Sequence, residues 1–213
     1  MKIVWCKPAI SLSICISILI IVFLLLLPDI ALAGEKLPSF NAKVGNKLSL
    51  DAYLGDSLCC VMTWKVKCSS CLKSQGKKTY GVQNLNDGDF KTCWAVTNKN
   101  NGIGEWFEYH LTNYQKAGGT TSFWGFKVAN GYLKSKELWL KNNRVKQMRV
   151  DINGKPKIYI NLADSMNNQR ISFHDAGLMV KDKDVIRLTI TKIYRGTKYH
   201  DTCITEIVPM GAL

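Results

Sequence analysis

The chain has 213 residues, with 29 Lys and Arg against 16 Asp and Glu, a formal net charge of +13 and a hydrophobic share of 46%. That length allows one ordinary domain with a short appendage. A charged share of 21% and six Trp exclude a disordered polymer, and 16 Gly with five Pro exclude a collagen-like or low-complexity chain, so a folded core is expected.

Residues 1–33 predict an export signal. Lys2 and Lys7 precede an apolar run from Ala9 to Leu27, and residues 31–33 read Ala-Leu-Ala, which is a small-x-small cleavage pattern. The alternative is a retained membrane anchor, because the apolar run of about twenty residues is just long enough to span a bilayer. We therefore expect the rest of the chain to be secreted, periplasmic or at the cell surface, with membrane contact only through an uncleaved leader.

The exported part remains strongly basic, because the leader removes only Lys2, Lys7 and Asp29 from the charged residues. Such a balance favours anionic partners, and an exported protein rarely meets nucleic acid, so an acidic polysaccharide or a lipid headgroup is the more relevant class. A solvated surface rich in Lys explains the same charge without any partner.

Six cysteines follow the leader, an even number in a chain bound for an oxidising compartment, which favours disulfides. They are Cys59, Cys60, Cys68, Cys71, Cys93 and Cys203. The sequence leaves their connectivity open, since six cysteines allow about fifteen pairings. The C-x-x-C spacing of Cys68 and Cys71 could also join Cys59 and Cys60 in a zinc site, although export disfavours four free thiolates.

Residues 34–64 form a mixed, polar lead-in, and short alternating runs begin at about residue 65. Runs of this kind, separated by Gly, Asn and Asp, predict an all-β sandwich. The expected strands are 103–111, 122–129, 145–152, 157–162, 185–194 (the longest) and 203–208. Asn153-Gly154 predicts a type I′ hairpin, because both residues tolerate positive φ. Helical periodicity is largely absent, and residues 161–166 are expected to form a loop.

Oxygen-bearing side chains crowd residues 84–94, where Asp87 and Asp89 flank Gly88. Hard cations such as Ca²⁺ take six to eight oxygen ligands, so this loop is a candidate cation site. The segment is not an EF-hand, since the 12-residue loop with its final Glu is missing. An ordinary Asx-rich β-turn accounts for the same residues by local hydrogen bonding alone.

Several motifs together resemble the discoidin-type domain, also called the coagulation factor five/eight type C or galactose-binding-like domain. They are Tyr80 to Asp89, Thr92 to Trp94, Gly102 to Trp106, Asn130 to Tyr132, Trp139 with Asn142 to Lys146, and Asp201 to Ile207. The resemblance spans roughly residues 65–209 and is greatest to the NADase-type glycan-binding branch, the NAD glycohydrolase translocation domain.

The resemblance implies a jelly-roll β-sandwich whose first and last strands lie close together and often hold a structural Ca²⁺. The matching positions are Asn84, Asp87, Asp89, Thr92, Thr205 and Glu206. In relatives, the residues matching Asp87 and Glu206 would give carboxylates, Thr92 its hydroxyl, and the other three mainly backbone carbonyls. The same arrangement implies a disulfide between Cys93 and Cys203, worth about 4–5 kcal/mol on the chain-entropy model.

The resemblance also implies a glycan site on loops at one end of the sandwich, although the sugar contacts vary among relatives. The candidate residues are Trp106, Trp124, Asn130, Tyr132, Trp139, Asn142 and Arg144. Each aromatic among them is also a candidate for the core, because aromatic side chains dominate buried area. The Lys and Arg residues between positions 134 and 146 could face an acidic glycan or simply solvent.

The sequence does not predict an enzyme. Glu105 and Glu108 are three residues apart on one expected strand and therefore lie on opposite faces, so they cannot act as a glycosidase pair. No nucleophile elbow or Walker A motif occurs. NAD hydrolysis in the relative that names the branch belongs to a separate domain, and residues 34–64 are too few to be one.

We therefore expect an exported, non-catalytic carbohydrate-binding module with a structural calcium ion. The alternative is a structural or protein-interaction module of the cell envelope that has no sugar site. A small hydrolase is a weaker third hypothesis, which an exposed carboxylate pair at catalytic separation would revive.

Overall fold

The computed structural model describes residues 36–48, 58, 62–76, 78–112 and 119–212. The expected leader at residues 1–33, part of the expected lead-in, and Cys59 and Cys60 lie outside these ranges. Among the described helices, none is both long and apolar enough to cross a bilayer.

The described part of the chain forms one hydrogen-bonded network of strands, in which β2-β9-β6-β12-β7-β11-β5-β3 is the main path. Strand β10 also pairs with β6, β4 with β12, and β8 with β7, while β1 pairs with β8. The strands are β1 (Ser39–Asn41), β2 (Lys43–Val44), β3 (Thr63–Cys68), β4 (Trp94–Val96), β5 (Trp106–Thr112), β6 (Thr120–Asn130), β7 (Asn143–Ile152), β8 (Lys155–Asn161), β9 (Gln169–Ser172), β10 (Met179–Lys181), β11 (Val185–Tyr194) and β12 (Thr202–Ala212).

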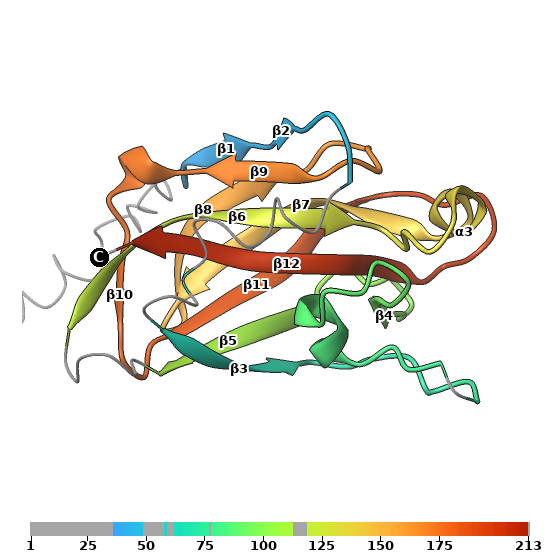
Figure 1. Cartoon of the computed structure of the whole chain (residues 1–213), viewed down its shortest axis with the longest axis horizontal. Coiled ribbons are helices and arrows are strands. Elements are labelled where there is room, and N and C mark those ends of the chain that lie inside the picture. Colours follow the sequence, from blue (N-terminus) through green and yellow to red (C-terminus); the bar gives the residue numbers. More distant parts are fainter. Residues whose placement is uncertain (1–35, 49–57, 59–61, 77, 113–118, 213) are drawn as a thin grey trace, which may run out of the picture. The chain divides into compact units, whose positions relative to one another are not determined.

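The strands form two layers around one apolar core, and Figure 1 shows β6 and β12 crossing over β8 and β11. The layers meet where β12 starts beside β7, with Thr202 opposite Asn143 and Cys203 opposite Arg144. The alternation expected in β11 puts Ile186, Leu188 and Ile190 in this core, each at most 1% exposed. Full burial of such a side chain contributes about 1.5–3 kcal/mol. The predicted all-β class is confirmed for the described residues, which form twelve strands and only short helical pieces.

The Asn153-Gly154 hairpin forms between β7 and β8, with φ of 51° and 74° at the two turn residues. Asn161 ends β8 and residues 162–166 are irregular, as expected. Strand β5 starts at Trp106 and not at Ile103, because Gly102 and Gly104 both adopt positive φ and place residues 101–104 in a turn. Ile103 is exposed as a result. Strands β6 and β12 have 11 residues each, so the 10-residue β11 is not the longest strand.

Part of the segment predicted as a lead-in joins the sheets. β1 pairs in parallel with β8, and β2 pairs antiparallel with β9. Residue 63, which also falls in that segment, begins β3. Strands β1 and β2 have only three and two residues and carry no clear alternating pattern, so their place in the sheet comes from the partner strands rather than from their own sequence.

A short helix, α3 (Lys136–Lys141), was not anticipated. The Oγ of Ser135 accepts a hydrogen bond from the Leu138 N–H at 3.1 Å, and Glu137 and Lys141 suit the first and last turns. Six residues are too few to show a helical period, so the only available signal was Ser followed by Glu before an apolar pair. Two 3₁₀ turns, η2 (Val82–Asn86) and η3 (His174–Ala176), complete the described elements.

Candidate functional site

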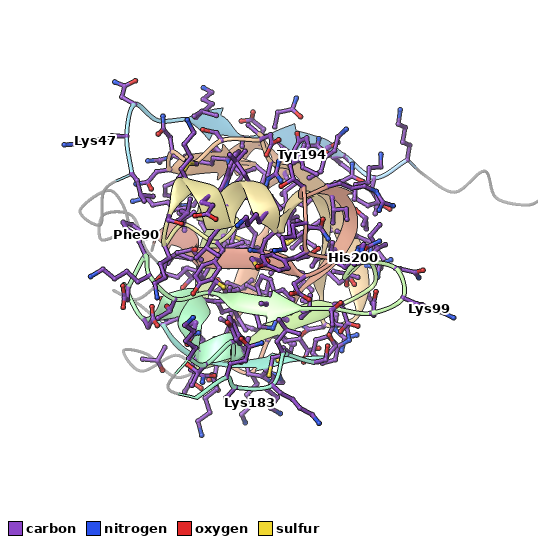
Figure 2. The ribbon with its side chains drawn as sticks, turned by 90° about the vertical axis from the view of Figure 1, so that its right-hand side faces the viewer. Lys47, Phe90, Lys99, Lys183, Tyr194 and His200 are labelled. Atoms are coloured by element: carbon purple, nitrogen blue, oxygen red, sulfur yellow. The ribbon has the colours of Figure 1, made fainter. Side chains whose placement is uncertain are left out.

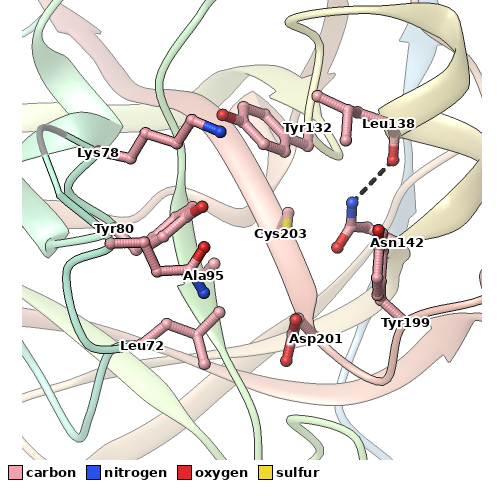
Figure 3. A pocket seen from close by; sticks show the side chains of 11 residues that line it. Leu72, Lys78, Tyr80, Ala95, Tyr132, Leu138, Asn142, Tyr199, Asp201 and Cys203 are labelled. Carbon is pink, nitrogen blue, oxygen red and sulfur yellow. Dashed lines mark hydrogen bonds between the residues drawn. The ribbon is translucent and has the colours of Figure 1, made fainter.

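A polar pocket opens at the end of the sandwich that carries α3. Figure 2 looks towards this end, with α3 in front and His200 to one side, and Figure 3 shows the pocket from close by. Its volume is about 210 Å³. It is lined by Leu72, Gln75, Lys78, Tyr80, Ala95, Tyr132, Leu138, Asn142, Tyr199, Asp201 and Cys203.

Four separate parts of the chain build this pocket. One wall is formed by Leu72, Gln75, Lys78 and Tyr80, and β4 and the start of β12 form the floor. Tyr132 follows β6, Asn142 caps the C-terminus of α3, and Tyr199 lies in the loop before β12. The Asn142 side-chain amide donates to the Leu138 carbonyl at 2.8 Å, which orients it towards the pocket (Figure 3). The pocket therefore depends on the packing of loops that are distant in sequence.

The chemistry of the pocket suits a ligand with several hydroxyl groups. Asp201 is an acceptor whose pKa is raised by burial, while a hydrogen bond from Thr97 and the charge of His200 oppose that rise. Tyr80 and Tyr132 meet edge to face at 6.5 Å between ring centroids. Tyr199 is 38% exposed as a residue, and the Lys198 ammonium lies 5.5 Å from the centroid of its ring. Burial and the nearby Cys93 raise the pKa of Tyr132 to about 12, so its hydroxyl is neutral and can donate or accept.

The pocket floor covers two buried cysteines. Cys93 and Cys203 are each 1% exposed, and they pack with Ala95 and Tyr132. Their thiols hydrogen-bond, and that bond together with burial raises the pKa of Cys203 well above its usual value. Both thiols are free in the structure, as are those of Cys68 and Cys71. The predicted closeness of Cys93 and Cys203 is therefore present, and the disulfide between them stays a prediction.

Three of the predicted glycan-binding residues form a buried support behind the pocket, which we call the Arg144 frame (Asn130, Trp139 and Arg144). Asn130 is fully buried and exchanges hydrogen bonds with both backbone groups of Val145 at 2.8 and 3.1 Å, and its own carbonyl accepts from Trp139 Nε1 at 2.9 Å. The guanidinium of Arg144 stacks on Trp139 at 4.5 Å and pairs with Asp164 through bonds of 3.0 and 2.7 Å.

The Arg144 frame also holds the pocket loops in place. Arg144 Nη1 donates to the carbonyls of Asn142 and Arg195, each at 3.1 Å. Gly131 has a φ of 93°, and a Cβ there would lie 2.6 Å from both Arg144 Cγ and Trp139 Cδ1. The frame is thus closely packed, and its polar groups are engaged by the protein itself.

The other predicted glycan-binding residues are divided by the fold. Tyr132 and Asn142 line the pocket, whereas Trp106 and Trp124 do not. Trp106 starts β5 under the guanidinium of Arg187 at 4.2 Å, and Trp124 lies on β6 with Arg170 at 5.2 Å from its ring. Sequence reasoning did not assign a glycan role to Tyr80, Tyr199 or Asp201. Tyr80 and Asp201 each begin one of the motifs that carry the resemblance, Tyr80 to Asp89 and Asp201 to Ile207, and these motifs were the available signal.

The predicted cation loop lies next to β12. Glu206, which is 2% exposed, accepts from the Gly88 N–H at 2.7 Å and shares a hydrogen bond with Asp87. Burial and that contact raise the pKa of Glu206 to about 8. The Thr92 hydroxyl donates to Asp87 at 2.8 Å, and the N–H of Asp89 donates to Asp87 at 2.9 Å. Asp87, Asp89, Thr92 and Glu206 are therefore close together.

The two remaining predicted cation ligands have side chains that serve the fold. The Asn84 amide donates to the carbonyls of Thr79 and Cys93, both at 2.9 Å, and the Thr205 hydroxyl donates to the Gly131 carbonyl at 2.7 Å. Among the described residues, no group of three His, Cys, Asp or Glu could hold a metal ion. A cation here would need backbone carbonyls and a hydroxyl beside the two carboxylates of Asp87 and Glu206, which is a donor set that hard cations accept.

The two glutamates considered as a catalytic pair have different partners. Glu105 accepts from Ser69, Ser70 and Asn98 at 2.5, 2.7 and 2.9 Å. Glu108 accepts from the guanidinium of Arg187 at 2.7 Å and contacts His110 at 3.0 Å. Each carboxylate is held by its own hydrogen bonds, and neither lines the pocket described above.

Comparison with known proteins yields one family. Residues 58–209 match the family described as the NAD glycohydrolase translocation F5/8 type C domain. No curated protein sequence matches the chain.

Solved structures of low sequence identity also match. One is an F5/8 type C domain of a Bacteroides fragilis protein, which is 14% identical in sequence and has a TM-score of 0.45. The match covers 82% of this chain and 98% of that one. Another is the family 32 carbohydrate-binding module of Streptococcus pneumoniae EndoD, at 10% identity, 68% and 94% coverage and a TM-score of 0.44. The arabinofuranosyltransferase AftD from Mycobacteria matches at 13% identity and a TM-score of 0.42, with 68% of this chain and 11% of that one covered.

Proposed function

This chain belongs to the NAD glycohydrolase translocation F5/8 type C domain family, and from that premise we propose that it is an exported, non-catalytic module that binds carbohydrate at the cell envelope or cell surface. The proposed ligand site is the pocket between residues 72–80, α3 and the loop that precedes β12. The leader predicted at residues 1–33 would direct the chain to that compartment, where it would be secreted, periplasmic or surface-bound.

The observation that carries the proposal is the combination of donors, acceptors and rings in one small pocket. Asp201 and Asn142 offer oxygen acceptors, the phenols of Tyr80 and Tyr132 offer donors, and Tyr199 offers an exposed ring. These groups suit a sugar, whose hydroxyls form hydrogen bonds and whose apolar ring face packs on an aromatic side chain. At about 210 Å³ the pocket is smaller than the roughly 300–1,000 Å³ of sites for drug-sized ligands, so it suits a single sugar unit.

We propose in addition that a structural Ca²⁺ binds beside β12. Asp87 and Glu206 would supply carboxylates and Thr92 its hydroxyl, with Asn84, Asp89 and Thr205 supplying backbone carbonyls. The support is chemical: the almost fully buried carboxyl group of Glu206 shares a hydrogen bond with the exposed carboxyl group of Asp87. A hard cation would favour the ionised form of both groups. Its role would be to hold the 84–92 loop against β12.

The test is a set of melting curves of the full-length chain with neutral and acidic glycans, each in Ca²⁺ and in EDTA. A ligand that binds only the native state raises its stability, so a glycan that fits should raise the Tm. The Asp201→Asn variant should lose that shift while keeping the Tm of the unliganded chain. A shift that survives Asp201→Asn unchanged would contradict the proposed site.

Absence of any glycan shift would favour the alternative, a structural or protein-interaction module of the envelope. In that case a Ca²⁺ shift without a glycan shift would still support the cation site. A melting curve that is identical in Ca²⁺ and EDTA would remove the cation proposal and leave the glycan proposal standing, because the two arms report on separate residues.

A further inference from the structure

A second pocket adjoins the proposed glycan site. It has a volume of about 220 Å³. It is lined by Lys78, Thr79, Asp89, Lys91, Thr92, Tyr132 and Lys134. Lys78 and Tyr132 line both pockets, so the two are neighbouring chambers that share a boundary. Figure 3 shows the Lys78 side chain extending towards the Tyr132 hydroxyl along this boundary.

The two chambers differ in charge. The first contains one lysine, Lys78, and one carboxylate, Asp201. The second contains three lysines and one carboxylate, Asp89. The Asp89 carboxylate turns back on its own loop, because its Oδ1 accepts the Lys91 N–H at 2.8 Å. The second chamber is therefore positive overall, whereas the first is balanced.

The lysines come from three different segments. Lys78 belongs to the wall at residues 72–80, Lys91 follows the 84–89 loop, and Lys134 lies between β6 and α3. All three are exposed, so each flexible side chain can move its ammonium group to meet a ligand. Convergence of three separate segments on one hollow is a stronger indication of a binding site than a run of Lys along one strand, because a run needs no common focus.

We propose that the second chamber binds the negatively charged unit of an acidic glycan, a sugar carrying a carboxylate, while the first chamber holds an adjoining sugar through its hydroxyls. This inference rests on the proposed carbohydrate-binding function and adds the class of ligand. Lys78 and Tyr132, common to both chambers, would contact both units. The lysines act here as compact point charges, which suits an anion without requiring one fixed orientation.

The experiment compares charged and uncharged forms of the same sugars on the full-length chain. The probes are trigalacturonate with its methyl ester, 3′-sialyllactose with its methyl ester, and an unsulfated heparosan tetrasaccharide with its carboxyl-reduced form. Calorimetry gives each Kd. We expect at least one acidic member to bind about tenfold more tightly than its neutral partner, with an advantage that shrinks as NaCl is raised, since exposed charges are screened.

A matched pair of double variants separates the chamber from the overall charge of the protein. Lys91→Gln with Lys134→Gln removes two charges from the second chamber and leaves the first chamber's lining intact. Lys155→Gln with Lys181→Gln removes two charges from exposed positions on β8 and β10, and β10 lies at the opposite end from α3 (Figure 1). The first pair should abolish the preference for the acidic sugar and keep the affinity for its neutral partner. The second pair should change neither.

Three results would overturn the inference, and they differ in what they leave standing. Equal binding of acidic and neutral partners, or equal loss in both double variants, would remove the acidic subsite and leave carbohydrate binding intact. A failure of every probe to bind would remove the proposed function itself, and this inference would fall with it. Circular dichroism of each variant shows that a lost preference does not come from unfolding.

Discussion

The Arg144 frame and the pocket in front of it lie side by side and differ in how their polar groups are used. In the frame, Asn130, Trp139 and Arg144 hydrogen-bond to protein groups at distances of 2.7 to 3.1 Å. In the pocket wall, by contrast, the side chains of Lys78 and Tyr199 are exposed. Residue types typical of sugar sites are therefore of two kinds in this fold. Some are hydrogen-bonded within the protein, and others are exposed at the pocket, where a ligand can reach them.

Arg144→Ala is expected to cause the greatest loss of folding stability. This change removes the stack on Trp139 and leaves Asp164 and two backbone carbonyls without their donor. Breaking a largely buried pair of this kind costs about 3–5 kcal/mol, and the cost falls towards the lower end because Asp164 is partly exposed. Urea denaturation measures it. An unchanged midpoint would show that the frame does not carry stability.

Arg144→Lys sharpens that result. Lysine keeps the charge and loses the two-pronged contact with Asp164 and the flat stack on Trp139. We expect most of the loss seen with alanine to persist. Full recovery with lysine would mean that charge alone stabilises this region.

Gly131→Ala should cause the next largest loss of folding stability. The new Cβ would lie 2.6 Å from side-chain atoms of Arg144 and Trp139, and the backbone there has a positive φ. Overpacking and backbone strain together cost about 2–4 kcal/mol. Gly154→Ala is the matched control, since Gly154 also has positive φ but nothing lies within 4 Å of its Cβ position. It should cost only about 1 kcal/mol. Equal losses in the two variants would contradict the packing argument.

Glu206→Gln tests the calcium proposal. In Ca²⁺ the variant should lose the stabilisation that the ion provides, about 2.7 kcal/mol when the ion is a hundredfold above its Kd. In EDTA the variant should be at least as stable as the natural chain, because a neutral side chain avoids ionisation of a buried carboxyl beside Asp87. Thermal melts in both buffers measure this. A variant that still responds to Ca²⁺ would exclude Glu206 as a ligand.

Glu105→Gln should have a smaller and pH-dependent effect. Burial raises the pKa of Glu105, but hydrogen bonds from Ser69, Ser70 and Asn98 outweigh it, so the pKa lies below the usual 4.5. A carboxylate with a lowered pKa stabilises the fold above its unfolded-state pKa, and that stability is lost as the pH falls through the lowered value. The variant should lose about 1 kcal/mol near neutral pH, after allowance for partial exposure.

The pH profile of unfolding supplies the check on Glu105. The natural chain should lose stability below about pH 4.5 more steeply than Glu105→Gln, so the two curves should converge in acid. Parallel curves across that range would show that the hydrogen bonds from Ser69, Ser70 and Asn98 do not favour the ionised form.

Much of the fold was predictable, since strand alternation and turn chemistry are local signals. The alternation of Ile186, Leu188 and Ile190 correctly predicted the buried face of β11. Asn153-Gly154 correctly predicted the hairpin between β7 and β8. The helix α3 was missed because six residues are too few to reveal a period. The beginning of β5 was placed too early because the positive φ of Gly102 and Gly104 is a three-dimensional property of that loop.

The site was predictable only in part. Among the residues predicted to bind glycan, Tyr132 and Asn142 line the pocket, whereas Trp106 and Trp124 lie outside its lining. Their glycan role stays a prediction. Aromatic type alone cannot separate a ligand platform from a residue that stacks on an arginine of a neighbouring strand. Asp201, Tyr199 and Tyr80 enter the pocket only because α3, β4 and β12 converge there, which no single stretch of sequence records.

We propose that the pocket binds carbohydrate, and that the Arg144 frame, Trp106 and Trp124 do not. The most direct test measures glycan affinity and Tm together for Tyr199→Ala and Trp124→Ala in the full-length chain. If the pocket is the glycan site, Tyr199→Ala should weaken glycan binding about tenfold or more with little change in Tm. The reason is that loss of one stacked aromatic ring lowers the binding free energy by roughly 1–2 kcal/mol. Trp124→Ala should keep its affinity. Undiminished binding in Tyr199→Ala with loss in Trp124→Ala would contradict the account.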